Sequence, residues 1–96
     1  MTLRTSKRYR SSVSILADIL EAVREEERVG KTRIMQKANL PTDRLETRLS
    51  QLLQQGLIQE ESDDDRRFYT LTEKGLEFLE QYDKARSFLK AFGMAL

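Results

Sequence analysis

Apolar residues in the middle of this 96-residue chain change their spacing, and that change limits the folds that the chain can adopt. Over residues 31–56, apolar residues recur every three or four positions, with a break at Pro41, which predicts two short helices. Residues 57–58 and 68–71 then form short apolar runs on either side of a polar stretch, as in a hairpin of two strands. The run Glu61 to Arg67 is so polar that we expect it to be a loop.

Helical periodicity also appears on both sides of this central unit. An apolar stripe follows Ser12, the expected N-cap of a first helix that stops at Gly30, and Thr32 is the candidate cap of the second helix. The third helix begins at about Thr42. A last helix follows Thr72 and runs to about residue 92. The predicted fold is mainly α (α+β), with the order α-α-α-β-β-α and a long C-terminal helix.

Composition excludes several function classes. The chain has no Cys and no His, which excludes disulfides, Cys or His metal ligands and imidazole catalysis. Its four glycines are isolated, so no glycine-rich phosphate loop is present. We therefore expect no enzyme, no cofactor and no metal site. No apolar run is long enough to span a bilayer and no signal peptide opens the chain, which predicts a soluble cytoplasmic protein without a membrane partner.

Charge is distributed in blocks, although the net charge is only +1. Residues 1–11 carry four basic and no acidic side chains, and residues 31–56 carry five basic against two acidic ones. The segments between and after them, 12–30 and 57–71, each carry five acidic against two basic ones. One basic face is therefore compatible with near-neutrality. The first block is either a solvated terminus or a flexible basic arm that lies on a polyanion.

The last helix carries an apolar seam with alternating spacings of four and three residues. Such spacing keeps a seam directed at a partner helix, which predicts a homodimer through a coiled coil. The alternative is a helix that folds back on its own core. The predicted dimer interface consists of Phe78, Tyr82, Ala85, Leu89 and Phe92.

Three motifs resemble those of a known family. They are K-T-R-I-M-x-x-A-N-L over residues 31–40, L-x-x-L-x-x-x-G-L-I over 49–58 and Y-x-L-T-x-K-G over 69–75. Together they resemble small archaeal winged helix-turn-helix regulators, and are similar to the dimeric chromatin-type members whose last helix forms an antiparallel coiled coil. The resemblance implies DNA binding by the third helix and the wing. Together with the charge pattern and the seam, the predicted domains are a flexible basic arm (1–11), a winged helix domain (12–71) and a coiled-coil dimerisation helix (72–96).

Candidate DNA contacts follow from this layout. Arginine pairs with guanine and glutamine with adenine in the major groove, and amide groups and a hydroxyl at a helix start suit a phosphate. In the wing, two arginines suit the backbone or the minor groove, whereas the adjacent Asp63, Asp64 and Asp65 serve either turn geometry or ion pairs. The predicted DNA-binding residues are Lys31, Thr32, Arg33, Thr42, Arg44, Thr47, Arg48, Gln51, Arg66 and Arg67.

The sequence therefore predicts a homodimer that binds double-stranded DNA, sequence-specifically or as an architectural protein, with a cytoplasmic, nucleoid-associated location. A transcriptional regulator and a chromatin protein both fit, and no feature indicates or excludes a small-molecule effector. The alternative is a winged-helix protein-interaction module without DNA binding, since one fold serves several functions. The acidic first helix and the three wing aspartates favour that alternative.

Overall fold

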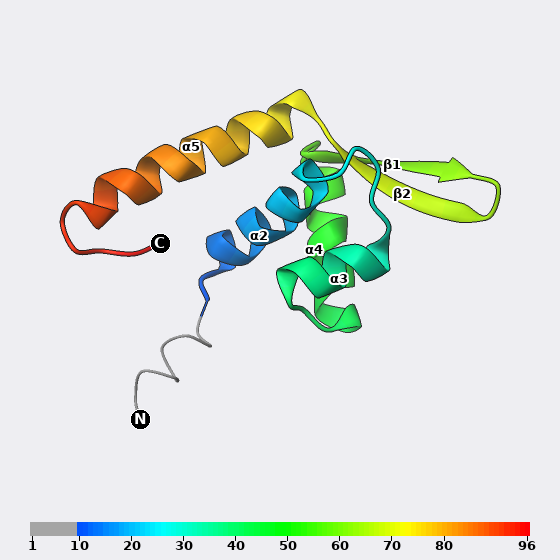
Figure 1. The fold of residues 1–96 in the computed structure, drawn as a ribbon, viewed down its shortest axis with the longest axis horizontal. Coiled ribbons are helices and arrows are strands. Elements are labelled where there is room, and N and C mark those ends of the chain that lie inside the picture. The colour runs from blue at the N-terminus through cyan, green and yellow to red at the C-terminus, as the bar shows by residue number, and fades with distance from the viewer. Residues whose placement is uncertain (1–9) are drawn as a thin grey trace.

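The structure, a computed structural model, describes residues 10–96 and has four helices and one antiparallel two-stranded sheet in that range (Figure 1). This order confirms the predicted mainly α (α+β) fold class. The elements are α2 (Ser12–Arg24), α3 (Lys31–Ala38), α4 (Thr42–Gln54), β1 (Ile58–Asp63), β2 (Arg66–Leu71) and α5 (Glu73–Lys90).

One apolar core joins all of these elements. Helix α2 is its centre because it packs against α3, α5 and β2, and it contributes the fully buried Ile19 and Leu20. Leu45 and Leu52 of α4 and Leu79 of α5 belong to the same cluster. Burying a side chain of this size stabilises the fold by about 1.5–3 kcal/mol. Within residues 10–96, Tyr69 is the one buried core residue whose side chain carries a polar group, its phenol.

Two predicted helix caps differ from the structure. Helix α2 is capped by Ser11, whose Oγ accepts a hydrogen bond of 3.0 Å from the Ser14 amide, and Ser12 is the first helical residue. Gly30, which was expected to stop the first helix, is instead the N-cap of α3, and no side chain caps it. Thr32 therefore lies inside α3 and is not a cap. Thr72 caps α5, with its Oγ1 3.0 Å from the Gly75 amide.

The hairpin is longer than predicted. Asp63 pairs with Arg66, so only residues 64–65 form the turn, and the prediction of a loop from Glu61 to Arg67 is wrong. All but the first residue of β1 are exposed, so the strand shows no apolar alternation that would reveal it in the sequence. Val29 adds a bridge on the other side of β2 through two hydrogen bonds with Tyr69, of 2.8 and 3.2 Å.

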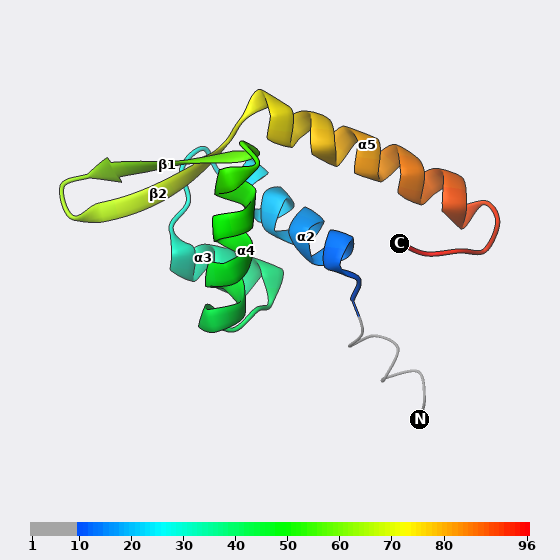
Figure 2. The same cartoon turned by 180° about the vertical axis from the view of Figure 1, so that it is seen from behind.

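Helix α5 packs on the other elements near its start and extends away from them toward its end. Its first half packs against α2 and β2 through Leu79, whereas its last residue, Lys90, lies beyond them. The hairpin, here called the wing, and the far end of α5 extend in opposite directions from the other helices (Figures 1 and 2). This arrangement leaves one side of α4 and one side of α5 open, and both are candidate binding surfaces.

Candidate nucleic-acid interface

Helix α4 lies at the surface with one apolar side turned inward. Leu45, Leu49 and Leu52 are buried, which fixes the rotation of the helix. The opposite residues, including Arg44 and Thr47, are exposed. The remaining predicted contacts on this helix, Arg48 and Gln51, lie at the edge of the buried side and are half-buried.

Three of the predicted contacts meet on one flank of α4. Arg44, Thr47 and Arg48 line a hollow of about 490 Å³, together with Ile15, Leu40 and Asp43. Arg48 Nη1 donates a 2.9 Å hydrogen bond to Ser12 Oγ, and a longer one of 3.5 Å to Gln51 Oε1. Arg44 forms no ion pair with any residue between 10 and 96. This flank therefore holds two cations that form no ion pair with any residue between 10 and 96, although Asp43 lines the same hollow.

The other flank, toward the wing, is charge-balanced. Lys31 Nζ lies 2.7 Å from Glu46 Oε2, and Arg67 Nη1 lies 3.4 Å from Glu60 Oε2. These four side chains and Tyr69 line a second hollow of about 280 Å³. The hydrogen bond to Glu46 raises the pKa of Lys31. Burial raises the pKa of the Tyr69 phenol, and the Glu60 carboxylate adds to this shift.

The outer side of α3 is also paired with acids. Arg33 Nε lies 2.9 Å from Glu26 Oε2, and Lys37 forms an ion pair with Glu25. The hydrogen bond from Lys37 lowers the pKa of Glu25. Two of the three predicted threonine contacts stand in the first turns of α3 and α4. Thr32 is exposed, and Thr42 Oγ1 lies 3.4 Å from the Met35 sulfur.

In the wing, the predicted contacts Arg66 and Arg67 differ in their partners. Arg67 pairs with Glu60, whereas Arg66 is exposed and has no ion pair in the described part of the chain. The wing carboxylates instead engage Arg28, which precedes α3. Its guanidinium lies 3.6 Å from Asp63, 3.9 Å from Glu61 and 4.3 Å from the centre of the Phe68 ring. Arg28 thus fixes the wing to the segment between α2 and α3.

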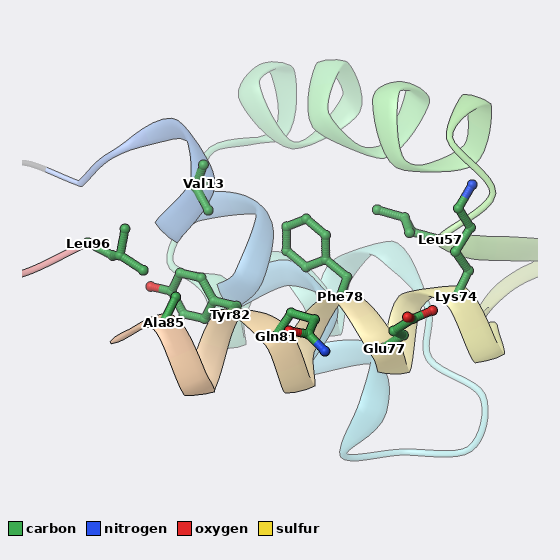
Figure 3. A pocket seen from close by; sticks show the side chains of 9 residues that line it. All are labelled: Val13, Leu57, Lys74, Glu77, Phe78, Gln81, Tyr82, Ala85 and Leu96. Carbon is green, nitrogen blue, oxygen red and sulfur yellow. The ribbon is translucent and has the colours of Figure 1, made fainter. Parts of the chain in front are cut away.

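A second open surface runs along α5. A groove of about 490 Å³ lies beside this helix, and Figure 3 shows apolar side chains along it with Lys74, Glu77 and Gln81 among them. Three of the five predicted interface residues, Phe78, Tyr82 and Ala85, line it. Phe78 and Tyr82 also pack against the chain's own core. Phe92 is 66% exposed and lies edge to face on Phe88, which is 65% exposed, with ring centres 5.2 Å apart. Leu89 is half-buried.

Sequence reasoning missed three residues of these surfaces. Phe88 lies outside the 4-3 seam, and Arg28 and Arg10 interact with residues far from them in the sequence. Arg10 was assigned to a basic arm over residues 1–11, but its side chain contacts α2 and the end of α3. The rest of that arm, residues 1–9, lies outside the described residues. Only the three-dimensional contacts could assign these roles.

Within residues 10–96, no cluster of acidic side chains is arranged to hold a metal ion. In the same range, no helix is both long enough and apolar enough to cross a membrane.

Comparisons with known proteins agree with this geometry. Residues 9–90 match the sequence profile of a protein family described as winged helix-turn-helix. No curated protein matches the sequence significantly. Among solved structures, the chain is similar to Sso10a-2, a DNA-binding protein from Sulfolobus solfataricus, with 29% identity and a TM-score of 0.73. That match covers 88% of this chain and 90% of Sso10a-2.

Two more distant structures share the fold. MepR, a transcription regulator of the Staphylococcus aureus multidrug efflux pump MepA, is 13% identical with a TM-score of 0.72, over 94% of this chain and 67% of MepR. BpsR of Bordetella bronchiseptica, whose DNA binding is regulated by 6-hydroxynicotinic acid, is 18% identical with a TM-score of 0.67. That match covers 83% of this chain and 56% of BpsR.

Proposed function

Because this chain belongs to the winged helix-turn-helix family, we propose that it binds double-stranded DNA as a homodimer and acts in the cytoplasm on the nucleoid. Both a transcriptional regulator and an architectural DNA-binding protein fit this role, and the proposal includes no catalytic step. The DNA-binding description of the similar Sso10a-2 supports it. In this proposal, residues 12–71 bind the DNA, residues 72–96 form the dimer and the arm over residues 1–11 adds basic charge.

The DNA-binding proposal rests mainly on one observation: Arg44 and Arg48, two cations on the open flank of α4, form no ion pair within residues 10–96. Arg44 has no acidic partner within residues 10–96, and Arg48 is bonded to a neutral hydroxyl. A phosphate that approaches these guanidinium groups therefore replaces water and not a carboxylate. A charge-assisted hydrogen bond to phosphate is about twice as strong as a neutral one. This flank therefore offers a polyanion two cations that need not first break an ion pair.

The dimensions of α4 fit the same partner. A helix about 10–12 Å across fits the major groove of B-DNA, which is about 12 Å wide. With α4 in that groove, Thr47 and Gln51 face the base edges, and Arg44 and Arg48 face one wall of the groove. Arg66 in the wing then reaches the neighbouring backbone or minor groove.

The other predicted contacts contribute less in this proposal. Lys31, Arg33 and Arg67 must each give up an ion pair with a glutamate before they meet a phosphate. Exposed ion pairs are worth only about 0–1 kcal/mol, so this exchange is feasible. Thr32 and Thr42 stand at the starts of α3 and α4, where a hydroxyl and free amide groups suit a phosphate oxygen.

The shape of α5 supports the dimer. The apolar groove lies along its first half, and the exposed Phe88 and Phe92 follow at its far end. In a two-fold symmetric pair, each copy offers the same surface to the other. The phenylalanines of one copy reach the groove of the other only if the two helices run antiparallel. This pairing covers apolar side chains that water otherwise contacts, among them Phe78, Tyr82, Ala85 and Leu89.

A salt series tests DNA binding. We expect the affinity for a fluorescent duplex, measured by anisotropy, to fall with a log–log slope of about 0.9 per phosphate contacted. Arg44→Ala and Arg48→Ala should each weaken binding and each reduce that slope by about 0.9. Lys84→Ala on α5 removes the same charge elsewhere and should change neither quantity. Unchanged binding by the Arg44/Arg48 double variant would refute the placement of α4.

Light scattering tests the dimer. We expect a mass near twice the 11.2 kDa of one chain. Phe88→Glu and Phe92→Glu place charges on side chains that are exposed in the single chain, so each should yield a folded monomer. Gln36→Glu, at an exposed position of α3, adds the same charge away from α5 and should leave the dimer intact. A wild-type chain that is monomeric at all concentrations excludes this interface.

The acid-paired cations favour a second candidate, a surface that binds another protein. In that case the balanced charges of Lys31, Glu46, Arg67 and Glu60 would contact a partner with alternating charges. The salt series separates the two candidates. If the surface serves a protein partner, the chain should show no measurable affinity for duplex DNA.

A further inference from the structure

Arg10 ties together three parts of the chain. Its Nη1 donates to Asp18 Oδ2 of α2 at 2.8 Å and to the carbonyl oxygen of Ala38 at 2.9 Å. Its Nη2 donates to the carbonyl oxygen of Asn39 at 3.1 Å. Ala38 is the last residue of α3, and Asn39 is its C-cap. One side chain thus joins the middle of α2 to the turn between α3 and α4.

We propose that Arg10 is a positioning residue for the DNA-binding helix and not a DNA contact: it locks the α3–α4 turn against α2 and so sets the direction of α4. This inference rests on the proposed DNA-binding function, because it assigns a role within the same interface. It changes the expected role of Arg10, which the sequence places among the basic residues of an arm.

The turn between α3 and α4 has two features that such hydrogen bonds would stabilise. The last carbonyl groups of a helix have no partner within the helix. Asn39 adopts a left-handed conformation with φ of 57°, which is less favourable for a side-chain-bearing residue than for glycine. Only Leu40 and Pro41 separate this residue from α4. A change in the Asn39 conformation therefore rotates α4 directly, and two hydrogen bonds from one guanidinium oppose such a change.

The same contacts argue against a direct role on DNA. Three N–H groups of the guanidinium already donate to protein oxygens, and the side chain is only 27% exposed. The Asp18 carboxylate also offsets its charge. Arg10 therefore differs from Arg44, whose guanidinium is exposed and has no carboxylate partner between residues 10 and 96.

Asp18 makes the proposal testable because the two roles predict opposite signs. If Arg10 is a lock, Asp18→Ala loosens it, and both Arg10→Ala and Asp18→Ala weaken the affinity for duplex DNA by about tenfold each. The double variant should then be little worse than either single one, since both remove the same unit. If Arg10 contacts phosphate, Asp18→Ala removes a repulsive charge and strengthens binding.

The binding assays use the full chain at several salt concentrations, well below the unfolding temperature of each variant. We expect the salt slope of Arg10→Ala to equal that of the wild type, whereas loss of a phosphate contact lowers it by about 0.9. Glu27→Ala, an exposed acid before α3, controls for the change in net charge and should leave affinity the same or slightly higher. Stronger binding by Asp18→Ala, or a reduced slope for Arg10→Ala, overturns the proposal.

Hydrogen exchange on the free protein separates this inference from the proposed function. Both variants should speed exchange of the Leu40 amide, which is bonded to the Met35 carbonyl at 3.2 Å, without DNA present. If exchange speeds up but no variant or wild-type chain binds DNA, the proposed function fails and the lock remains. If wild type binds DNA and both variants bind equally well, Arg10 has no positioning role, whatever their melting temperatures.

Discussion

The contact between Gly75 and the Leu57 backbone yields the sharpest prediction about the fold. Gly75 is the third residue of α5 and is buried. A Cβ added there would overlap the carbonyl oxygen of Leu57, and would lie 2.7 Å from Leu71 Cδ1 and 3.1 Å from the Leu57 carbonyl carbon. The nearest obstacle is backbone, which cannot rotate away as a flexible side chain can. In Gly75→Ala, α5 must therefore move away from the Leu57 backbone.

Two opposing effects set the size of this change. Alanine favours a helix over glycine by about 1 kcal/mol. Overpacking costs about 1–3 kcal/mol when the surroundings give way, and occasionally more. Displacing α5 also exposes part of Leu79, whose full burial is worth about 1.5–3 kcal/mol. We expect a net loss of about 2 kcal/mol in the free energy of unfolding.

Urea denaturation followed by circular dichroism measures this loss, at a fixed protein concentration because a dimer's stability depends on it. Gly30→Ala is the matched control, since its added Cβ meets only the Arg67 carbonyl oxygen, at an ordinary 3.8 Å. Gly30→Ala should lower the free energy of unfolding by well under half as much as Gly75→Ala does. A Gly75→Ala chain at least as stable as the wild type would show that α5 does not pack closely on Leu57, and the position of the apolar groove would then be wrong.

Three further predictions concern single side chains. Burial raises the pKa of Tyr69, so the folded state holds the phenol proton more tightly than the unfolded state does. The free energy of unfolding should therefore fall as pH rises above about 10. Tyr69→Phe should remove that part of the fall, which urea titrations at alkaline pH would measure. Glu46→Gln frees Lys31 and should raise DNA affinity about two- to fivefold in anisotropy assays, and lower affinity would contradict the proposed contact. Arg28→Ala should speed amide exchange in the wing while changing the melting temperature little, and equal exchange rates would mean that Arg28 does not hold the wing.

The order of the elements could be predicted because each helix buries one stripe. Leu45, Leu49 and Leu52 recur at helical spacing and are all buried in α4. The ends of the elements were less predictable. Thr32 and Ser12 have side chains suited to capping, but the caps are Gly30 and Ser11, two positions and one position earlier. A cap preference is worth about 1 kcal/mol, which packing of a buried stripe outweighs.

The length of the wing and the partners of its charges could not be predicted. The length of the wing depends on backbone pairing of exposed residues that lack apolar alternation, and the partners of its charges include the distant Arg28, so no periodic pattern encodes either. Arg10 and Arg28 show why. From sequence alone, a basic residue near a basic segment is interpreted as a DNA contact, because its acidic partner is not known. The predicted contacts on α4 needed less information, because the buried stripe alone defines which side of the helix is open.

The wing acids bear on the choice between a DNA partner and a protein partner. Three adjacent aspartates beside two arginines favour a protein partner if all five side chains are free. In the structure, Asp63 pairs with Arg28, and Asp64 takes the left-handed turn position with φ of 56°, which Asp tolerates better than most residues. Two of the three acids thus serve the shape of the wing, and Arg66 is left without an ion pair within residues 10–96. Because Arg28 offsets the charge of Asp63, the wing acids oppose a polyanion less than the sequence alone suggests, which weakens the case for a protein partner.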